Sequence, residues 1–97
     1  MRQLALVLVL SFAPAISYAA TISYNLCNKH GVRDMPIVAK DKKNNMSIVY
    51  SGSVAKDRCV AVSSSTGNGD HAEIELKVDQ GAPYGVSWIK AGDDVNF

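Results

Sequence analysis

The sequence predicts an all-β fold: a small antiparallel β-sandwich or barrel of about six short strands with one disulfide. Apolar and polar residues alternate with the period of a β-strand along most of the chain, most regularly over 71–78. Clusters of turn-forming residues separate these segments about every 10 to 14 residues. No stretch of about ten or more residues keeps a helical periodicity. Together these observations favour strands joined by turns over any helical arrangement.

Residues 1–19 have the pattern of an export signal. A positive start at Arg2 precedes an apolar run over 4–10, and Pro14 interrupts the weaker apolar continuation. Ser17 and Ala19 place small residues three and one positions before a cut between Ala19 and Ala20. The apolar run is shorter than the roughly 20 residues that a membrane-spanning helix needs. We therefore expect cleavage of residues 1–19, no membrane span thereafter, and a single small β-domain over 20–97 in the periplasm or outside the cell.

The mature chain has two cysteines, Cys27 and Cys59. An exported protein meets an oxidising compartment, and two cysteines allow one intramolecular pairing. No Cys-x-x-Cys motif of a redox site is present. The sequence therefore predicts a structural disulfide that ties the end of the first strand to a later one.

The first half of the mature chain has four candidate strands. Tyr24 lies on the apolar face of the first, and Pro36 near the start of the second indicates an edge or entry position, because proline lacks a ladder donor. The polar run over 41–45 has the length of a hairpin connection, and 51–53 forms a turn. Residues 54–58 fit either an irregular strand or one helical turn. The four segments are 22–27, 35–40, 46–50 and 59–62.

The second half of the chain contains the clearest strand. Residues 63–70 are serine- and glycine-rich and read as the most flexible loop. In 71–78, apolar residues alternate with charged ones, so this strand should have one solvated face. Residues 84–89 form a last strand after the turn at 79–83. The tail over 91–97 either adds a short strand or frays.

Charge divides the mature chain into two halves of opposite sign. Residues 20–58 carry seven basic and three acidic side chains, a net of +4, whereas residues 59–97 carry two basic and six acidic ones, a net of −4. The simpler interpretation is that antiparallel strands bring the halves together and their charges pair. The alternative is a pair of separate surface patches that steer a charged partner. The candidate partner-binding residues are Lys40, Lys42 and Lys43 on the basic side, and Glu73 and Glu75 on the acidic side.

The candidates for proton-transfer chemistry centre on the two histidines, as a pair or as His71 with Glu73. His30 and His71 could form an acid–base pair, as in small secreted ribonucleases, if the fold brought them together. His71, Glu73 and Glu75 share one strand face, but a zinc site needs three or four converging ligands. We expect a solvated strand face here, with no metal, no cofactor and no catalytic residue.

Trp88 and Tyr84 share a predicted strand face. Because the chain has few other large apolar residues, the simpler interpretation places both in the core. The alternative is an exposed recognition platform, since tryptophan and tyrosine are favoured at binding surfaces, and Trp88 is therefore a further candidate partner-binding residue.

The sequence therefore favours an exported, non-catalytic binding protein, of inhibitor or immunity type, with a protein or envelope-component partner. The neutral mature chain does not favour nucleic acid as the partner. One alternative is a small secreted ribonuclease-like toxin or hydrolase using His30 and His71. Another is a structural surface protein; Pro36 and the lysines argue against open-ended strand pairing, so we expect a monomer.

Overall fold

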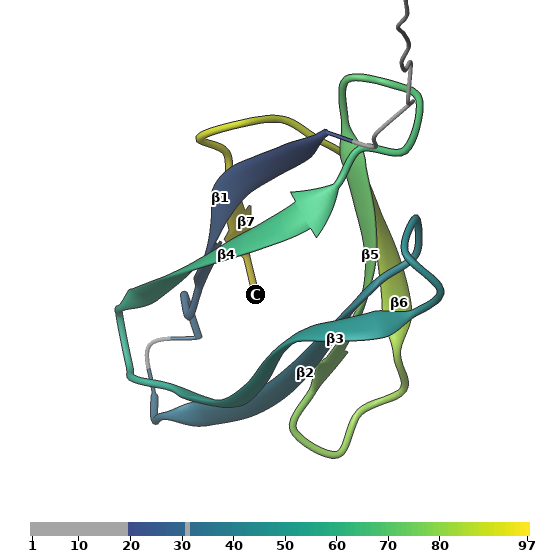
Figure 1. Cartoon of the computed structure of the whole chain (residues 1–97). Coiled ribbons are helices and arrows are strands. Elements are labelled where there is room, and N and C mark those ends of the chain that lie inside the picture. The colour runs from purple at the N-terminus through teal and green to yellow at the C-terminus, as the bar shows by residue number, and fades with distance from the viewer. Residues whose placement is uncertain (1–19, 31) are drawn as a thin grey trace, which may run out of the picture.

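The computed structural model describes residues 20–30 and 32–97, and every described element is a β-strand (Figure 1). The expected export signal over 1–19 lies outside the described residues. No described helix is long and apolar enough to cross a membrane. The strands are β1 (Thr21–Cys27), β2 (Met35–Asp41), β3 (Ser47–Val54), β4 (Cys59–Ser65), β5 (Ala72–Val78), β6 (Tyr84–Ile89) and β7 (Asp94–Asn96).

The strands form two sheets, which confirms the expected all-β sandwich. The smaller sheet has the order β4-β1-β7, and the larger has the order β3-β2-β5-β6. All pairs are antiparallel except β1 with β7. The tail therefore forms a seventh strand, which pairs in parallel with the first. Figure 1 shows the two sheets facing each other, with β4 and β3 on the near side.

The core lies between the sheets and is built by the inward residues of the alternating strands. β5 shows this most plainly, because Ala72, Ile74 and Leu76 are fully buried while the residues between them are partly exposed. β1 contributes Tyr24 and Leu26 from the opposite sheet. Burial raises the pKa of the Tyr24 hydroxyl, which shares a 2.6 Å hydrogen bond with the hydroxyl of Ser64. The core is therefore mostly aliphatic, with one buried tyrosine.

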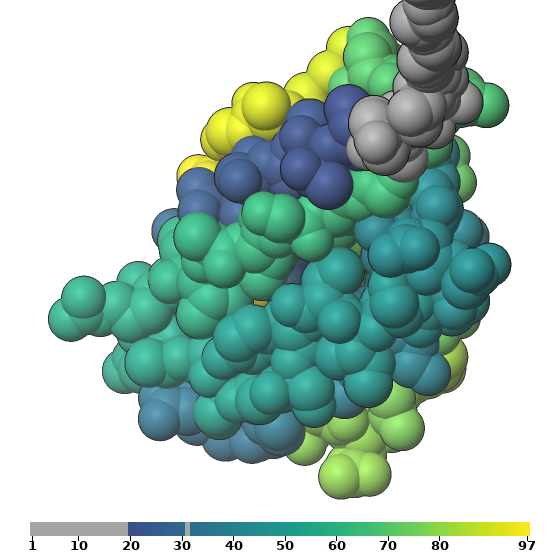
Figure 2. Space-filling model, in the orientation of Figure 1, coloured from purple at the N-terminus to yellow at the C-terminus, as the bar shows by residue number. Residues whose placement is uncertain are grey.

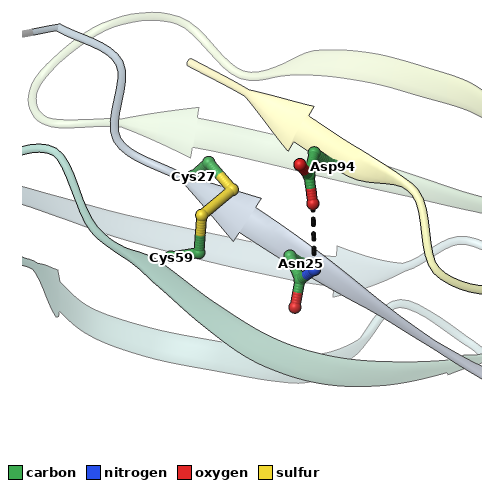
Figure 3. Close-up of a disulfide and its surroundings, with 4 residues drawn as sticks. All are labelled: Asn25, Cys27, Cys59 and Asp94. Carbon is green, nitrogen blue, oxygen red and sulfur yellow. Dashed lines mark hydrogen bonds between the residues drawn. A yellow bond between two sulfur atoms is a disulfide. The ribbon is translucent and has the colours of Figure 1, made fainter.

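The disulfide joins Cys27 to Cys59, as the sequence predicts (Figure 3). The two residues are direct partners in the β1–β4 register, at the end of β1 and the start of β4. On the other side of β1, the Asn25 side-chain amide donates a 2.9 Å hydrogen bond to Asp94 of β7. Both neighbours of β1 are thus held to it by side chains as well as by the backbone.

Two buried polar side chains connect segments that are not joined by the backbone hydrogen bonds between paired strands. The Asp41 carboxylate, 1% exposed, accepts hydrogen bonds from the backbone N–H groups of Lys43 (2.9 Å) and Ser65 (2.7 Å). It therefore ties the end of β2 to the end of β4 in the other sheet. The Asn28 amide is fully buried and donates to the carbonyl oxygens of Arg33 and Val54, both at 3.0 Å. Such buried groups are tolerated because each has partners.

Three local expectations need correction. Residues 63–65, expected in the flexible loop, belong to β4, and Ser64 and Ser65 are buried. Serine lacks strand propensity, but here the hydrogen bond between the Tyr24 and Ser64 hydroxyls and the one from the Ser65 N–H to Asp41 hold the segment in place. Pro36 was expected at an edge or entry position; it is the second residue of β2, so the entry alternative is confirmed, and only the edge alternative is wrong because β2 is an interior strand. β3 runs on to Val54, beyond the expected turn at 51–53.

Candidate functional site

The outer face of the larger sheet gathers most of the candidate binding residues. Lys40 of β2 is the direct register partner of Glu75 of β5. The backbone of Lys42 bonds that of Glu73, with 2.9 Å between N and O, so these residues are also neighbours. The oppositely charged halves are therefore interleaved on adjacent strands and do not form two separate patches. Within 20–30 and 32–97, no ion pair joins these lysines to these glutamates, and their charged groups stay available to solvent.

Lys43 does not belong to this face. Its ammonium group donates to the carbonyl oxygens of Thr66 (3.3 Å) and His71 (2.9 Å). Both acceptors lie in the connection between β4 and β5, so Lys43 fixes that loop. Of the three candidate lysines, Lys40 and Lys42 remain as surface groups.

Trp88 lies on this outer face, not in the core. Its residue is 67% exposed, and Tyr84 is 46% exposed, so the expectation that both fill the core is wrong. For Trp88 the cause is an irregularity in the β5–β6 register between Ala72 and Ile74. Val86 and Ile89 pair with the inward residues Ile74 and Ala72, so two residues of β6, Ser87 and Trp88, stand opposite one residue of β5. Such a bulge redirects side chains, and here it turns the indole outward.

The backbone of Trp88 is itself unusual. Its φ is 61°, in the left-handed region that favours glycine. Residues with a Cβ in this region carry a cost of order 1–2 kcal/mol. The fold therefore holds a bulky, exposed residue in an unfavourable conformation, which is a recognised mark of functional positions.

His71 supports the indole from one side. The two rings are stacked with centroids 3.9 Å apart and planes inclined by 25°. The imidazole is placed between two carboxylates: Nδ1 lies 3.2 Å from Asp70, and Nε2 lies 3.6 Å from Glu73. These contacts fix the plane of the ring and, through it, the plane of Trp88.

Asp70 joins this cluster to β6. Its carboxylate also lies 3.3 Å from the ammonium group of Lys90. The hydrogen bond with His71, followed by the interactions with Lys90, holds the pKa of the Asp70 carboxyl below its usual value. Because this pKa is lowered, the carboxylate stays ionised as the pH falls through the usual range of an aspartate, and the interactions are lost only below that range.

A shallow depression lies on the same face of the larger sheet. It has a volume of about 340 Å³ and is lined by Val38, Lys40, Glu75, Lys77 and Pro83. The lining combines apolar side chains with charges of both signs. Such a surface suits a partner that presents both polar and apolar groups.

The structure does not bring the two histidines together. The backbone of Asn28 bonds that of Arg58 just beyond the carboxyl end of β1, and His30 follows in that loop. Thr66 bonds Ala20 at the opposite end of β1, and His71 follows Thr66. At about 3.3 Å per strand residue, the seven-residue strand between these ends spans roughly 20 Å. The two imidazoles therefore cannot act on one bond in this arrangement.

The metal-ligand candidates are only partly brought together. His71 and Glu73 are in contact, whereas Glu75 lies opposite Lys40. In the part of the chain that the structure describes, no group of three or more His, Cys, Asp or Glu side chains is placed to hold a metal ion.

Sequence reasoning missed the bulge and the residues around it, Asp70 and Lys90. One signal was present: Val86 and Ile89 are three residues apart, which a regular strand with one apolar face does not allow. Comparison with protein-family models, curated proteins and solved structures gives no significant match to this chain. The functional argument therefore depends on the geometry of the outer face.

Proposed function

We propose that this protein is an exported, non-catalytic binding protein of inhibitor or immunity type, which contacts a partner protein or envelope component through Trp88 and its surroundings. The observation that carries the proposal is the exposed, backbone-strained indole of Trp88, stacked on a fixed imidazole. Removing this ring from water against a partner would supply a large apolar contact at one point, which is how binding hot spots are built.

The chemistry around Trp88 supports a binding role. His71 lets the ring keep one orientation, so little conformational freedom is lost on association. Lys40, Lys42, Glu73 and Glu75 place charges of both signs on the same face of the sheet. A polar rim around an aromatic centre favours a partner with complementary charges and steers its orientation.

Export is supported by the disulfide and by the leader pattern of residues 1–19. A stable disulfide is compatible with an oxidising compartment, such as the periplasm or the extracellular medium. The proposal places the mature protein there and its partner in the same compartment. No observation favours the alternative of a histidine-dependent hydrolase, since the outward cluster at His71 has no second imidazole.

Trp88→Gly tests the proposal without disturbing the fold. Glycine is favoured at the observed φ, so we expect the free energy of unfolding to change by less than about 1 kcal/mol. Loss of a hot-spot indole should raise the dissociation constant for the partner by about 30-fold or more. The measurement is quantitative capture of the partner from envelope and medium by the tagged, exported protein, followed by titration of the recovered complex.

The matched control is Val32→Ala, because Val32 is also 67% exposed but lies in the loop between β1 and β2. This variant should bind like the original chain. Lys42→Glu should weaken binding less than Trp88→Gly does, because charges at the rim of an interface act mainly on association rates. Equal binding by the Trp88→Gly variant and the original protein would remove the basis of the proposal.

A further inference from the structure

The two sheets have four edge strands, and three of them are protected against pairing with another chain. β3 is interrupted by a register shift near Tyr50, whose hydroxyl bonds the Ser53 carbonyl at 2.8 Å. β6 carries the bulge at Trp88, and β7 has three residues. Bulges, short length and covering side chains are the usual means of blocking sheet edges.

Among the described residues, β4 has no bulge and is not short, and a side chain bonds its outward edge only at Ser65, whose N–H donates to Asp41. Its seven residues, Cys59–Ser65, pair with β1 without any register shift, and the strand contains no charged residue and no proline. Pro36 and Lys40, which were expected to guard an edge, lie in the interior strand β2. The sequence argument for a monomer therefore does not apply to β4. Figure 2 shows β4, in green, at the surface, with a hollow between it and β3.

The hydrogen bonds at both ends of β4 define which backbone groups point away from β1. The Arg58 carbonyl accepts from Asn28, and the Thr66 N–H donates to Ala20, so the even-numbered residues face β1. The odd-numbered residues consequently face outward. Asp41 binds the N–H of Ser65, whereas within the described residues the N–H groups of Ala61 and Ser63 have no hydrogen-bond partner.

We propose that the β4 edge binds the β4 edge of a second copy of this chain in antiparallel orientation, with the two Ala61 residues opposite each other at a twofold axis. The edge is self-complementary, because Ala61 and Ser63 are small and exposed and allow close approach. In this register Val60 faces Val62 of the second copy, which extends the apolar side of the sheet. Arg58 faces Ser64 of the second copy, so no like charges are opposed.

The charge-free edge is the reason for choosing a second copy over another occupant. In an isologous antiparallel pair each position faces its symmetry-related position on the other copy, so a strand with like charges at those positions would repel itself. β4 has no charged residue at any of these positions, so two copies can pair without such repulsion, and the strand is long enough to do so. This interface is separate from the Trp88 face, so the two proposals can fail independently.

Sedimentation equilibrium of the exported, disulfide-intact protein up to about 1 mM tests the pairing. Ala61→Pro removes an outward N–H without removing a β1–β4 hydrogen bond, and Ala61→Lys places two ammonium groups at the twofold axis. We expect a concentration-dependent dimer whose dissociation constant rises at least about tenfold in Ala61→Lys and Ala61→Pro. Ala61→Thr, which keeps an uncharged and strand-compatible residue, should dimerise like the original protein.

Circular dichroism and thermal unfolding would confirm that each variant is folded before its mass is interpreted. If Ala61→Pro fails to fold, Ala61→Lys and Ala61→Thr still decide the question, since neither alters the backbone. A protein that stays monomeric at the highest concentration overturns the proposal. A dimer that Ala61→Lys leaves unchanged overturns it equally, because association would then use another surface.

Discussion

Replacing both cysteines, in the double variant Cys27→Ala/Cys59→Ala, is expected to lower the free energy of unfolding by roughly 3 to 4 kcal/mol. The disulfide closes a loop with a sequence separation of 32, and its loss frees the unfolded chain to sample many more conformations. A core of this size rarely supplies more than about 3–5 kcal/mol by itself. The double variant should therefore be close to unfolding at room temperature. Urea denaturation followed by circular dichroism measures the change.

Reduction of the original protein provides the control for this prediction. With reductant present, its denaturation curve should approach that of the double alanine variant, because both lack the same cross-link. If the reduced protein and the double variant had free energies of unfolding within about 1 kcal/mol of that of the oxidised protein, a major stabilising role for the disulfide would be contradicted.

The second large effect is expected for Asp41→Ala, with a loss of about 3 kcal/mol or more in the free energy of unfolding. The substitution removes the acceptor for two backbone N–H groups, those of Lys43 and Ser65, and the carboxylate is almost completely buried. Ser65 is itself buried, so water does not readily replace the lost partner. The measurement is urea denaturation together with amide hydrogen exchange, in which the N–H of Ser65 should lose its protection.

Asp34→Ala is the matched control for this second prediction. The Asp34 carboxylate also accepts a backbone hydrogen bond, from Lys56 at 2.9 Å, but it is exposed. Its loss should lower stability by only about 0.5–1.5 kcal/mol, because water replaces the acceptor. Equal losses for the two variants would show that Asp41 does not connect the two sheets in the way its contacts indicate.

The parts of the fold that follow from local alternation could be predicted from the sequence. β5 is the clearest case, because each apolar residue over 72–76 faces the core and each glutamate faces outward. The disulfide could also be predicted, because two cysteines in a chain with the pattern of an export signal allow one pairing. The order of the strands could not be derived, since β1 pairs with both β4 and β7 through contacts distant in sequence. Alternation specifies the face of a residue but not its neighbour.

The candidate site was only partly accessible to sequence reasoning. Glu73 and Glu75 were correctly placed on a solvated face. Trp88 was expected in the core because a regular strand puts it on the same face as Val86, and a single bulge reversed that assignment. Lys43 was grouped with Lys42 by proximity in the chain, yet tertiary hydrogen bonds to Thr66 and His71 turn it away. Both differences come from contacts between strands that a linear pattern does not encode.

Radical footprinting of the protein in its native envelope or medium tests most directly whether the Trp88 face binds a partner. Trp88 is the only tryptophan of the chain, and His30, which is exposed in the distant loop, serves as the internal reference. The proposed function predicts that oxidation of Trp88 falls several-fold relative to the purified protein, while His30 is oxidised as before. Equal oxidation of Trp88 in both samples would contradict it.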